Sequence, residues 1–161
     1  MKKLYILLVM LLASVAAIAQ DGRSLYNKYS DLDNVEAVYI SPAMFRLMGK
    51  IPDIEMEGEN VNFAPIIKTL TGLYILNITQ EDIAADLAED VKRFIQKGQY
   101  ELLMEAKDSG EVMRLYTVGN DQIVNSLVML ARQASETSFI CIDGTMPRDQ
   151  LEDLIAKATQ D

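Results

Sequence analysis

Four apolar, strand-like runs follow one another between Tyr100 and Asp143, and their clustering constrains the fold more than any other feature of the chain. The runs are Tyr100 to Lys107, Glu111 to Val118, Ile123 to Arg132 and Ser138 to Asp143. The third run could instead be a helix, because periodicity does not settle a buried run of this length. Clustered strands with helices segregated from them indicate an α+β fold.

Other predicted elements precede and follow this cluster. Val35 to Ser41 and Leu73 to Ile78 are predicted strands, which brings the sheet to about six strands. The predicted helices are Ser24 to Leu32, Pro42 to Met48, Pro65 to Leu70, Thr79 to Lys97 and Pro147 to Thr159. We therefore expect a mixed, mainly antiparallel sheet packed with helices.

The longest predicted helix has signals at both ends. Thr79 followed by Asp82 is a variant of the capping box, and Gly98 is a typical C-terminal stop. Its apolar stripe consists of Ile83, Leu87, Val91, Phe94 and Ile95. Because these residues lie on one side of the helix, the helix is amphipathic and its other side faces water.

Beyond this helix, Asp108-Ser109-Gly110 is predicted to be a three-residue hairpin loop, which places Lys107 opposite Glu111. In that register the core face of the hairpin carries Tyr100, Leu102, Met104, Ala106, Val112, Tyr116 and Val118. The other face carries Leu103, Met113 and Leu115 among Glu101, Glu105, Lys107 and Glu111. Neighbouring strands are also apolar on both sides, so we expect something to cover this second face.

The start of the chain has the pattern of a leader peptide. Lys2 and Lys3 precede an apolar run, and Ala17-Ile18-Ala19 is a small-x-small cleavage site, which together predict a secretory signal peptide over residues 1–19. The run is too short for a membrane span, and no Cys follows it to accept a lipid anchor. We expect a single exported domain, residues 20–161, in the periplasm or outside the cell, without a stable membrane anchor.

Composition excludes several classes of function. The net charge of −9 becomes −11 once Lys2 and Lys3 leave with the leader, and this charge disfavours nucleic-acid binding. The chain has no His, which excludes Ser-His-Asp and Cys-His catalysis and His-ligated zinc. Its one Cys, Cys141, cannot form an internal disulfide, so it is either buried and inert or available to another chain.

Two patterns resemble functional sites without completing them. The segment Asp53-x-Glu55-x-Glu57-Gly58 has the early spacing of a calcium loop, but Ala64 stands where the bidentate Glu belongs. Glu101 and Glu105 would lie roughly 13 Å apart on one strand, too far for a glycosidase pair. The sequence therefore predicts no metal, no cofactor and no catalytic residue, and it favours a non-catalytic protein over an enzyme.

Three segments are similar to recurring segments of one family: VYISPAMFRLMGK (Val38 to Lys50), YELLMEAKDSGEVMRLYTVG (Tyr100 to Gly119) and SFICIDGTM (Ser138 to Met146). They resemble the domain-of-unknown-function 4252 family, whose members are small exported bacterial proteins, some of them lipid-anchored. The resemblance extends over nearly all of residues 20–161. It implies an envelope location and an α+β fold, and it supplies no activity or catalytic residue.

Two hypotheses for the function follow. The first is an exported, non-catalytic envelope protein that acts as an interaction or regulatory module, in which the second face of the sheet meets an envelope protein or a second copy. The residues of this interaction face are Leu103, Met113, Leu115, Glu101 and Glu105. Helices packed on both faces of the sheet would weaken this hypothesis.

The second hypothesis is a small-ligand-binding protein, or an enzyme without His, with a pocket between the sheet and the helices. The polar groups available to such a pocket are Tyr39, Tyr74, Arg114 and Tyr116. These four residues could instead complete the edge of the core. A deep pocket that contains Arg114 would favour the ligand hypothesis.

Overall fold

The computed structural model of the chain describes residues 22–48 and 64–158, and its centre is one six-stranded sheet. The strands are β1 (Val35–Ile40), β2 (Leu70–Ile78), β3 (Glu101–Asp108), β4 (Glu111–Gly119), β5 (Ile123–Arg132) and β6 (Thr137–Pro147). They lie in the order β1-β2-β6-β5-β4-β3, and every neighbouring pair is antiparallel. The helices are α2 (Gly22–Tyr29), α3 (Pro42–Met48), α4 (Ala64–Ile67), α5 (Glu81–Lys97) and α6 (Arg148–Ala158). The predicted α+β fold is confirmed, and the run from Ile123 to Arg132 is a strand.

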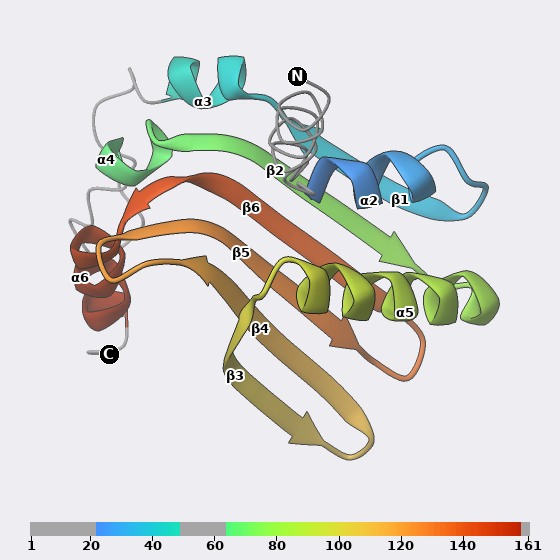
Figure 1. Cartoon of the computed structure of the whole chain (residues 1–161). Coiled ribbons are helices and arrows are strands. Elements are labelled where there is room, and N and C mark those ends of the chain that lie inside the picture. The colour runs from blue at the N-terminus through green and yellow to red at the C-terminus, as the bar shows by residue number, and fades with distance from the viewer. Residues whose placement is uncertain (1–21, 49–63, 159–161) are drawn as a thin grey trace, which may run out of the picture.

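Two helices cover one face of the sheet, which we call the helix face. Figure 1 shows α2 and α5 lying over this face, while the hairpin of β3 and β4 projects beyond α5. The main core lies between them and the sheet, with Leu25 and Tyr29 from α2, Leu87, Val91 and Phe94 from α5, and Leu76, Val128, Phe139 and Cys141 from the strands. The amphipathic stripe predicted for α5 therefore packs as expected, with Ala84 in place of the half-buried Ile83.

A smaller cluster lies at one end of the opposite face, which we call the second face. Ile66 of α4 packs there with Val124 and Met146, and Leu151 of α6 packs against them. The same cluster contains Leu127 and Ile142, which are strand residues of the second face. The described helices therefore pack on both faces, and on the second face this cluster lies at the end of the sheet formed by the start of β2, the start of β5 and the end of β6.

Helix α2 begins directly over β6. A Cβ on Gly22 would lie 2.3 Å from the sulfur of Cys141 and 3.3 Å from the ring of Tyr74, so only Gly fits this position. The Gly22 N–H donates a hydrogen bond to the Asp143 carboxylate at 3.2 Å, where the helix dipole favours a negative charge. Cys141 itself is fully buried. This burial agrees with the first of the two alternatives for Cys141, a thiol inside the core, and not with a thiol available to another chain.

The predicted capping box at the start of α5 is wrong. The N-cap is Gln80, one residue after Thr79, and it makes no side-chain cap hydrogen bond. Asp82 instead accepts a hydrogen bond from the N–H of Ile83 at 2.9 Å. Because Glu81 and Asp82 both lie in the first turn, their negative charges favour this end of the helix through its dipole.

The last strand continues past its predicted end at Asp143. Gly144 lies inside β6, where a Cβ would be 2.7 Å from the carbonyl oxygen of Thr69. The Thr145 N–H donates to that same oxygen at 3.0 Å. Gly144 therefore marks the close approach of two backbones and not the end of a strand.

At the other end of the chain, α2 is shorter than predicted. It ends at Tyr29, so Leu32 lies beyond the helix and is exposed.

Candidate functional site

The hairpin between β3 and β4 closes with a two-residue turn instead of the predicted three-residue loop. Ser109 and Gly110 have φ values of 48° and 92°, and a type I′ turn requires positive values at both central positions. Asp108 therefore faces Glu111, and Lys107 faces Val112. The predicted pairing of Lys107 with Glu111 is wrong, because the shorter turn moves the register by one residue.

A β-bulge at Leu103 makes a second change in the hairpin. Before the bulge Leu102 faces Tyr116, and after it Met104 faces Leu115. Directly opposite residues of an antiparallel pair point to the same face. Met104 therefore joins Leu115 on the second face, although its predicted position was in the core. Leu102, Leu103 and Met104 are all about half exposed.

The structure brings together only part of the predicted interaction face. Ala106 faces Met113, which together with Leu115 lies on the second face, and Glu101 points to that face as well. Glu105 does not, because it faces Arg114 on the helix side of the hairpin. The predicted placement of Ala106 in the core and of Glu105 beside Met113 is wrong, because the two-residue turn shifts these residues by one position against β4.

The register of all six strands aligns one uninterrupted row of apolar residues across the second face. This apolar row consists of Val38, Ile75, Ile140, Met129, Leu115 and Met104. Strands are spaced about 4.8 Å apart, so the row is roughly 24 Å long. Val38 and Met104 at its ends are 48% and 45% exposed, the inner four residues are half-buried, and none of the six belongs to either buried cluster.

The two faces of the sheet differ in their charges. The charged strand residues of the helix face have both signs, Glu105, Lys107, Arg114, Arg132 and Asp143. Those of the second face are all acidic, Glu36, Glu101, Asp108 and Glu111. Glu136 joins them from the turn before β6, because its carboxylate accepts a hydrogen bond from Ser138 of the second face at 3.2 Å.

Ion pairing follows the same division. Within the described residues, the ion pairs join Lys28 and Arg93 to Asp90, and Lys107 and Arg114 to Glu105. All of these groups lie on the helix side of the molecule, so none of the acids of the second face is paired with a described base. At the hairpin tip two of those acids even stand opposite each other, a like-charge pair that costs up to about 1 kcal/mol.

The four residues proposed for a ligand pocket are not brought together. Tyr39 and Tyr74 stack on β1 and β2 with ring centroids 5.2 Å apart. Arg114 and Tyr116 lie on β4, which is three strand spacings from β2 and four from β1, or about 14 and 19 Å. Tyr74 is buried in the main core and Tyr116 packs against it, so these residues complete the core and its edge.

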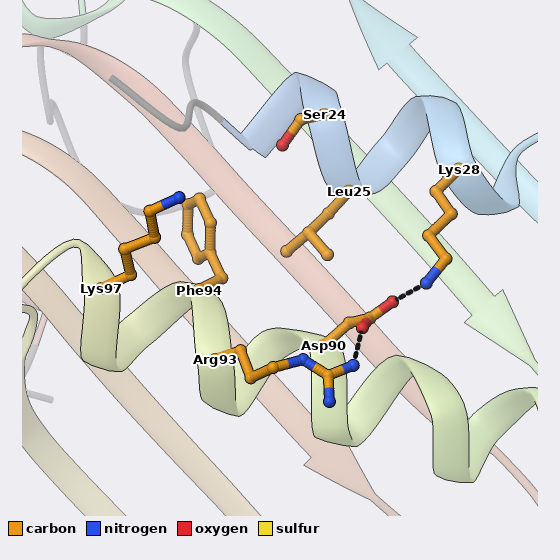
Figure 2. Close-up of a pocket in the computed structure, with 7 residues that line it drawn as sticks. All are labelled: Ser24, Leu25, Lys28, Asp90, Arg93, Phe94 and Lys97. Carbon is orange, nitrogen blue, oxygen red and sulfur yellow. Dashed lines mark hydrogen bonds and ion pairs between the residues drawn. The ribbon is translucent and has the colours of Figure 1, made fainter. Parts of the chain in front are cut away.

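A cleft of about 340 Å³ lies between α2 and α5. Its lining, drawn in Figure 2, consists of Ser24, Leu25, Lys28, Asp90, Arg93, Phe94 and Lys97, and Arg114 is not among them. Asp90 lies at its centre and accepts hydrogen bonds from Lys28, from Arg93 and, at 2.6 Å, from the Tyr29 hydroxyl. The only sequence signal for this cluster is the three-residue spacing of Asp90 and Arg93 on one predicted helix.

The cluster changes the titration of two of its members. Burial alone would raise the pKa of Asp90, but the hydrogen bonds from Lys28, Tyr29 and Arg93 outweigh it and lower that pKa from 3.8 to about 2. Burial and the hydrogen bond to Asp90 raise the pKa of Tyr29 well above its ordinary value. The carboxylate is therefore held ionised, and its hydrogen bonds join α2 to α5.

Acid should remove this contribution to stability. Because the pKa of Asp90 is lower in the folded protein than in the unfolded chain, the pairing stabilises the fold above about pH 4 and is lost as the pH falls towards 2. We expect a loss of about 1 kcal/mol, since Lys28 and Arg93 are exposed and screened. Urea denaturation of the protein and of Asp90→Asn, between about pH 2 and pH 6, measures it. An acid dependence as steep in the variant as in the parent would contradict this role.

The remaining expectations concern metals, membranes and the leader. Among the described residues, no group of three potential metal ligands lies together. A second cavity, of about 280 Å³, is smaller than the cleft between α2 and α5 and is lined by Asn34, Val35, Glu36, Asn77, Thr79 and Glu136. None of the described helices is long and apolar enough to span a bilayer. The predicted signal peptide over residues 1–19 and the acidic segment from Asp53 to Gly58 lie outside the described residues.

Comparison with known proteins gives one finding. No curated protein and no solved structure matches the chain significantly. One family model, described as a domain of unknown function (DUF4252), matches residues 29–154. That stretch contains all six strands and every residue of the apolar row. The resemblance inferred from the three sequence segments is therefore confirmed, and the chain belongs to the DUF4252 family.

Proposed function

We propose that this chain is a non-catalytic interaction module whose apolar row binds another protein. The observation that carries the proposal is the row itself, six apolar side chains aligned across every strand of the sheet and outside both buried clusters. A sheet with one face on the core ordinarily presents polar residues on the other face. Contiguous exposed apolar surface rimmed by charge is typical of a protein-binding site.

The packing of α4 and α6 limits this surface without removing it. These helices reach Leu127 and Ile142, which flank the apolar row on one side. Val38 and Met104, at the two ends of the row, remain about half exposed. The proposed binding surface therefore consists of the apolar row and the side of the row that faces away from Leu127 and Ile142. It does not include the part of the second face that α4 and α6 cover.

The ligand and enzyme alternatives have less support. In the cleft between α2 and α5, the Asp90 carboxylate already accepts hydrogen bonds from two bases and a tyrosine hydroxyl. The leader-like residues at the start of the chain support an exported protein, and we propose the cell envelope as its place of action.

Leu115→Glu tests the proposal. We expect it to lower the free energy of unfolding by less than about 1 kcal/mol, because the new carboxylate stays in water. We also expect it to abolish partner binding, because the charge would be buried unpaired in an apolar interface. Urea denaturation measures the first effect. The elution volume of the tagged protein in a detergent-free extract of its own cells measures the second.

Val112→Glu is the matched control, because Val112 is a half-buried residue of the same strand that points to the helix face. The parent and the control should elute as one large species in the extract, and Leu115→Glu should elute at its monomer position. Elution of all three at the monomer position would refute the proposal. A doubled mass of the purified parent in light scattering, lost in Leu115→Glu, would identify the partner as a second copy.

A further inference from the structure

Four acids of the second face lie along one side of the apolar row, whereas Glu101, which faces Thr117, lies on the other side. Glu36 is in the next row of the register, at the start of β1, and Glu136 is in the turn before β6. Asp108 and Glu111 are at the tip of the hairpin between β3 and β4. In this antiparallel sheet, those four positions share one end of the strands. We call these four residues the acidic margin.

The charges of the acidic margin are available to a partner. None of the four is ion-paired with a base among the residues that the structure describes. Asp108 and Glu111 repel each other directly across the hairpin, and a cation placed between them would relieve that repulsion. On the opposite side of the row, α4 and α6 pack against Leu127 and Ile142. A partner that lies on the row therefore meets unpaired negative charge along its other side.

We infer that the partner is a basic amphipathic protein segment, with an apolar stripe that lies on the apolar row and Lys or Arg residues that face the acidic margin. The inference rests on the proposed function and specifies the partner. Electrostatic complementarity of this kind selects between partners by penalising like charges. A second copy would bring a second acidic margin and a net charge of −9, and an anionic membrane would be repelled for the same reason.

Two synthetic peptides test the inference. One is an amphipathic helix of Leu and Lys, about 18 residues and roughly 27 Å long, which matches the length of the row. The other has Glu in place of every Lys. Fluorescence anisotropy at low and at physiological salt measures the affinity of each labelled peptide for the full chain. We expect the Lys peptide to bind and the Glu peptide to bind at least about a hundredfold more weakly.

Matched variants locate the charge effect. Asp108→Asn with Glu111→Gln should weaken Lys-peptide binding about fivefold and reduce its salt dependence. Asp86→Asn with Glu89→Gln removes the same charge from the exposed side of α5 and should change the affinity less than twofold. An equal loss in both double variants would mean general attraction to an acidic protein and would overturn the inference.

The two proposals fail in different ways. If Leu115→Glu abolishes binding of both peptides and the parent binds them equally well, the apolar row is a binding surface and the basic character of the partner is wrong. If Leu115→Glu leaves binding of the Lys peptide unchanged, the row is not the binding surface, and the proposed function fails with the inference. Sedimentation of the protein with phosphatidylglycerol vesicles would also overturn the choice of a basic protein segment.

Discussion

Phe139→Ala should lower the free energy of unfolding by about 4 kcal/mol, whereas Ile140→Ala, one residue further along β6, should lower it by about 1 kcal/mol. The two side chains point to opposite faces of the sheet. Phe139 is fully buried in the main core, where removal of its ring would leave a cavity between β6 and the helices. Ile140 lies in the apolar row, is half-buried and belongs to neither buried cluster.

Urea denaturation followed by circular dichroism measures both variants, with the slope of the transition as a check that each unfolds as the parent does. The ratio of the two losses is the informative quantity, because it compares the two faces at neighbouring positions of one strand. Equal losses of several kcal/mol would mean that the second face is as deeply buried as the helix face. The apolar row would then be part of the protein's own core.

Much of the fold can be predicted from the sequence because local patterns determine it. The apolar runs become strands, and Leu87, Val91 and Phe94 of α5 face the sheet as their helical spacing predicts. The presence of a second apolar face can also be predicted. Leu73 and Ile75 point to one side of their strand and Tyr74 and Leu76 to the other, so neither side is polar. These inferences need only the periodicity of each segment and do not depend on how strands pair.

The composition of the second face cannot be predicted in the same way, because it depends on register. Asp108-Ser109-Gly110 is compatible with a two-residue or a three-residue connection, and the choice decides which residues face each other. The bulge at Leu103 has no marker in the sequence, since it lies among three apolar residues without a Gly. The two-residue connection makes Met104 and Glu105 exchange faces relative to the prediction, and the bulge returns Leu102 to its predicted face.

The acidic margin was missed for a related reason. Glu36, Glu136 and Glu111 are far apart in the sequence and come together only through the strand order β1-β2-β6-β5-β4-β3. One local signal was available: the acids at the two ends of the hairpin turn, Asp108 and Glu111, would repel in a two-residue connection. An unfavourable pair that the fold retains is the kind of local conflict that functional sites show.

The methionines of the chain permit a direct test of whether the apolar row is covered by a partner. Met104 and Met129 lie in the row, Met44 is 46% exposed on α3, and Met146 is 1% exposed in the smaller cluster. Peroxide oxidises exposed thioethers faster than buried ones. In the purified protein, Met44 and Met104 should be oxidised fastest and Met146 slowest, with Met129 between them.

The decisive measurement is the oxidation rate of Met104 and Met129 relative to Met44, determined by mass spectrometry for the purified protein and for the protein in intact cells. Met44 corrects for the different peroxide concentrations, because it lies outside the proposed interface. If a partner occupies the apolar row, both relative rates should fall several-fold in cells while Met146 stays protected in both samples. Unchanged relative rates for Met104 and Met129 would contradict the claim that this face binds another protein.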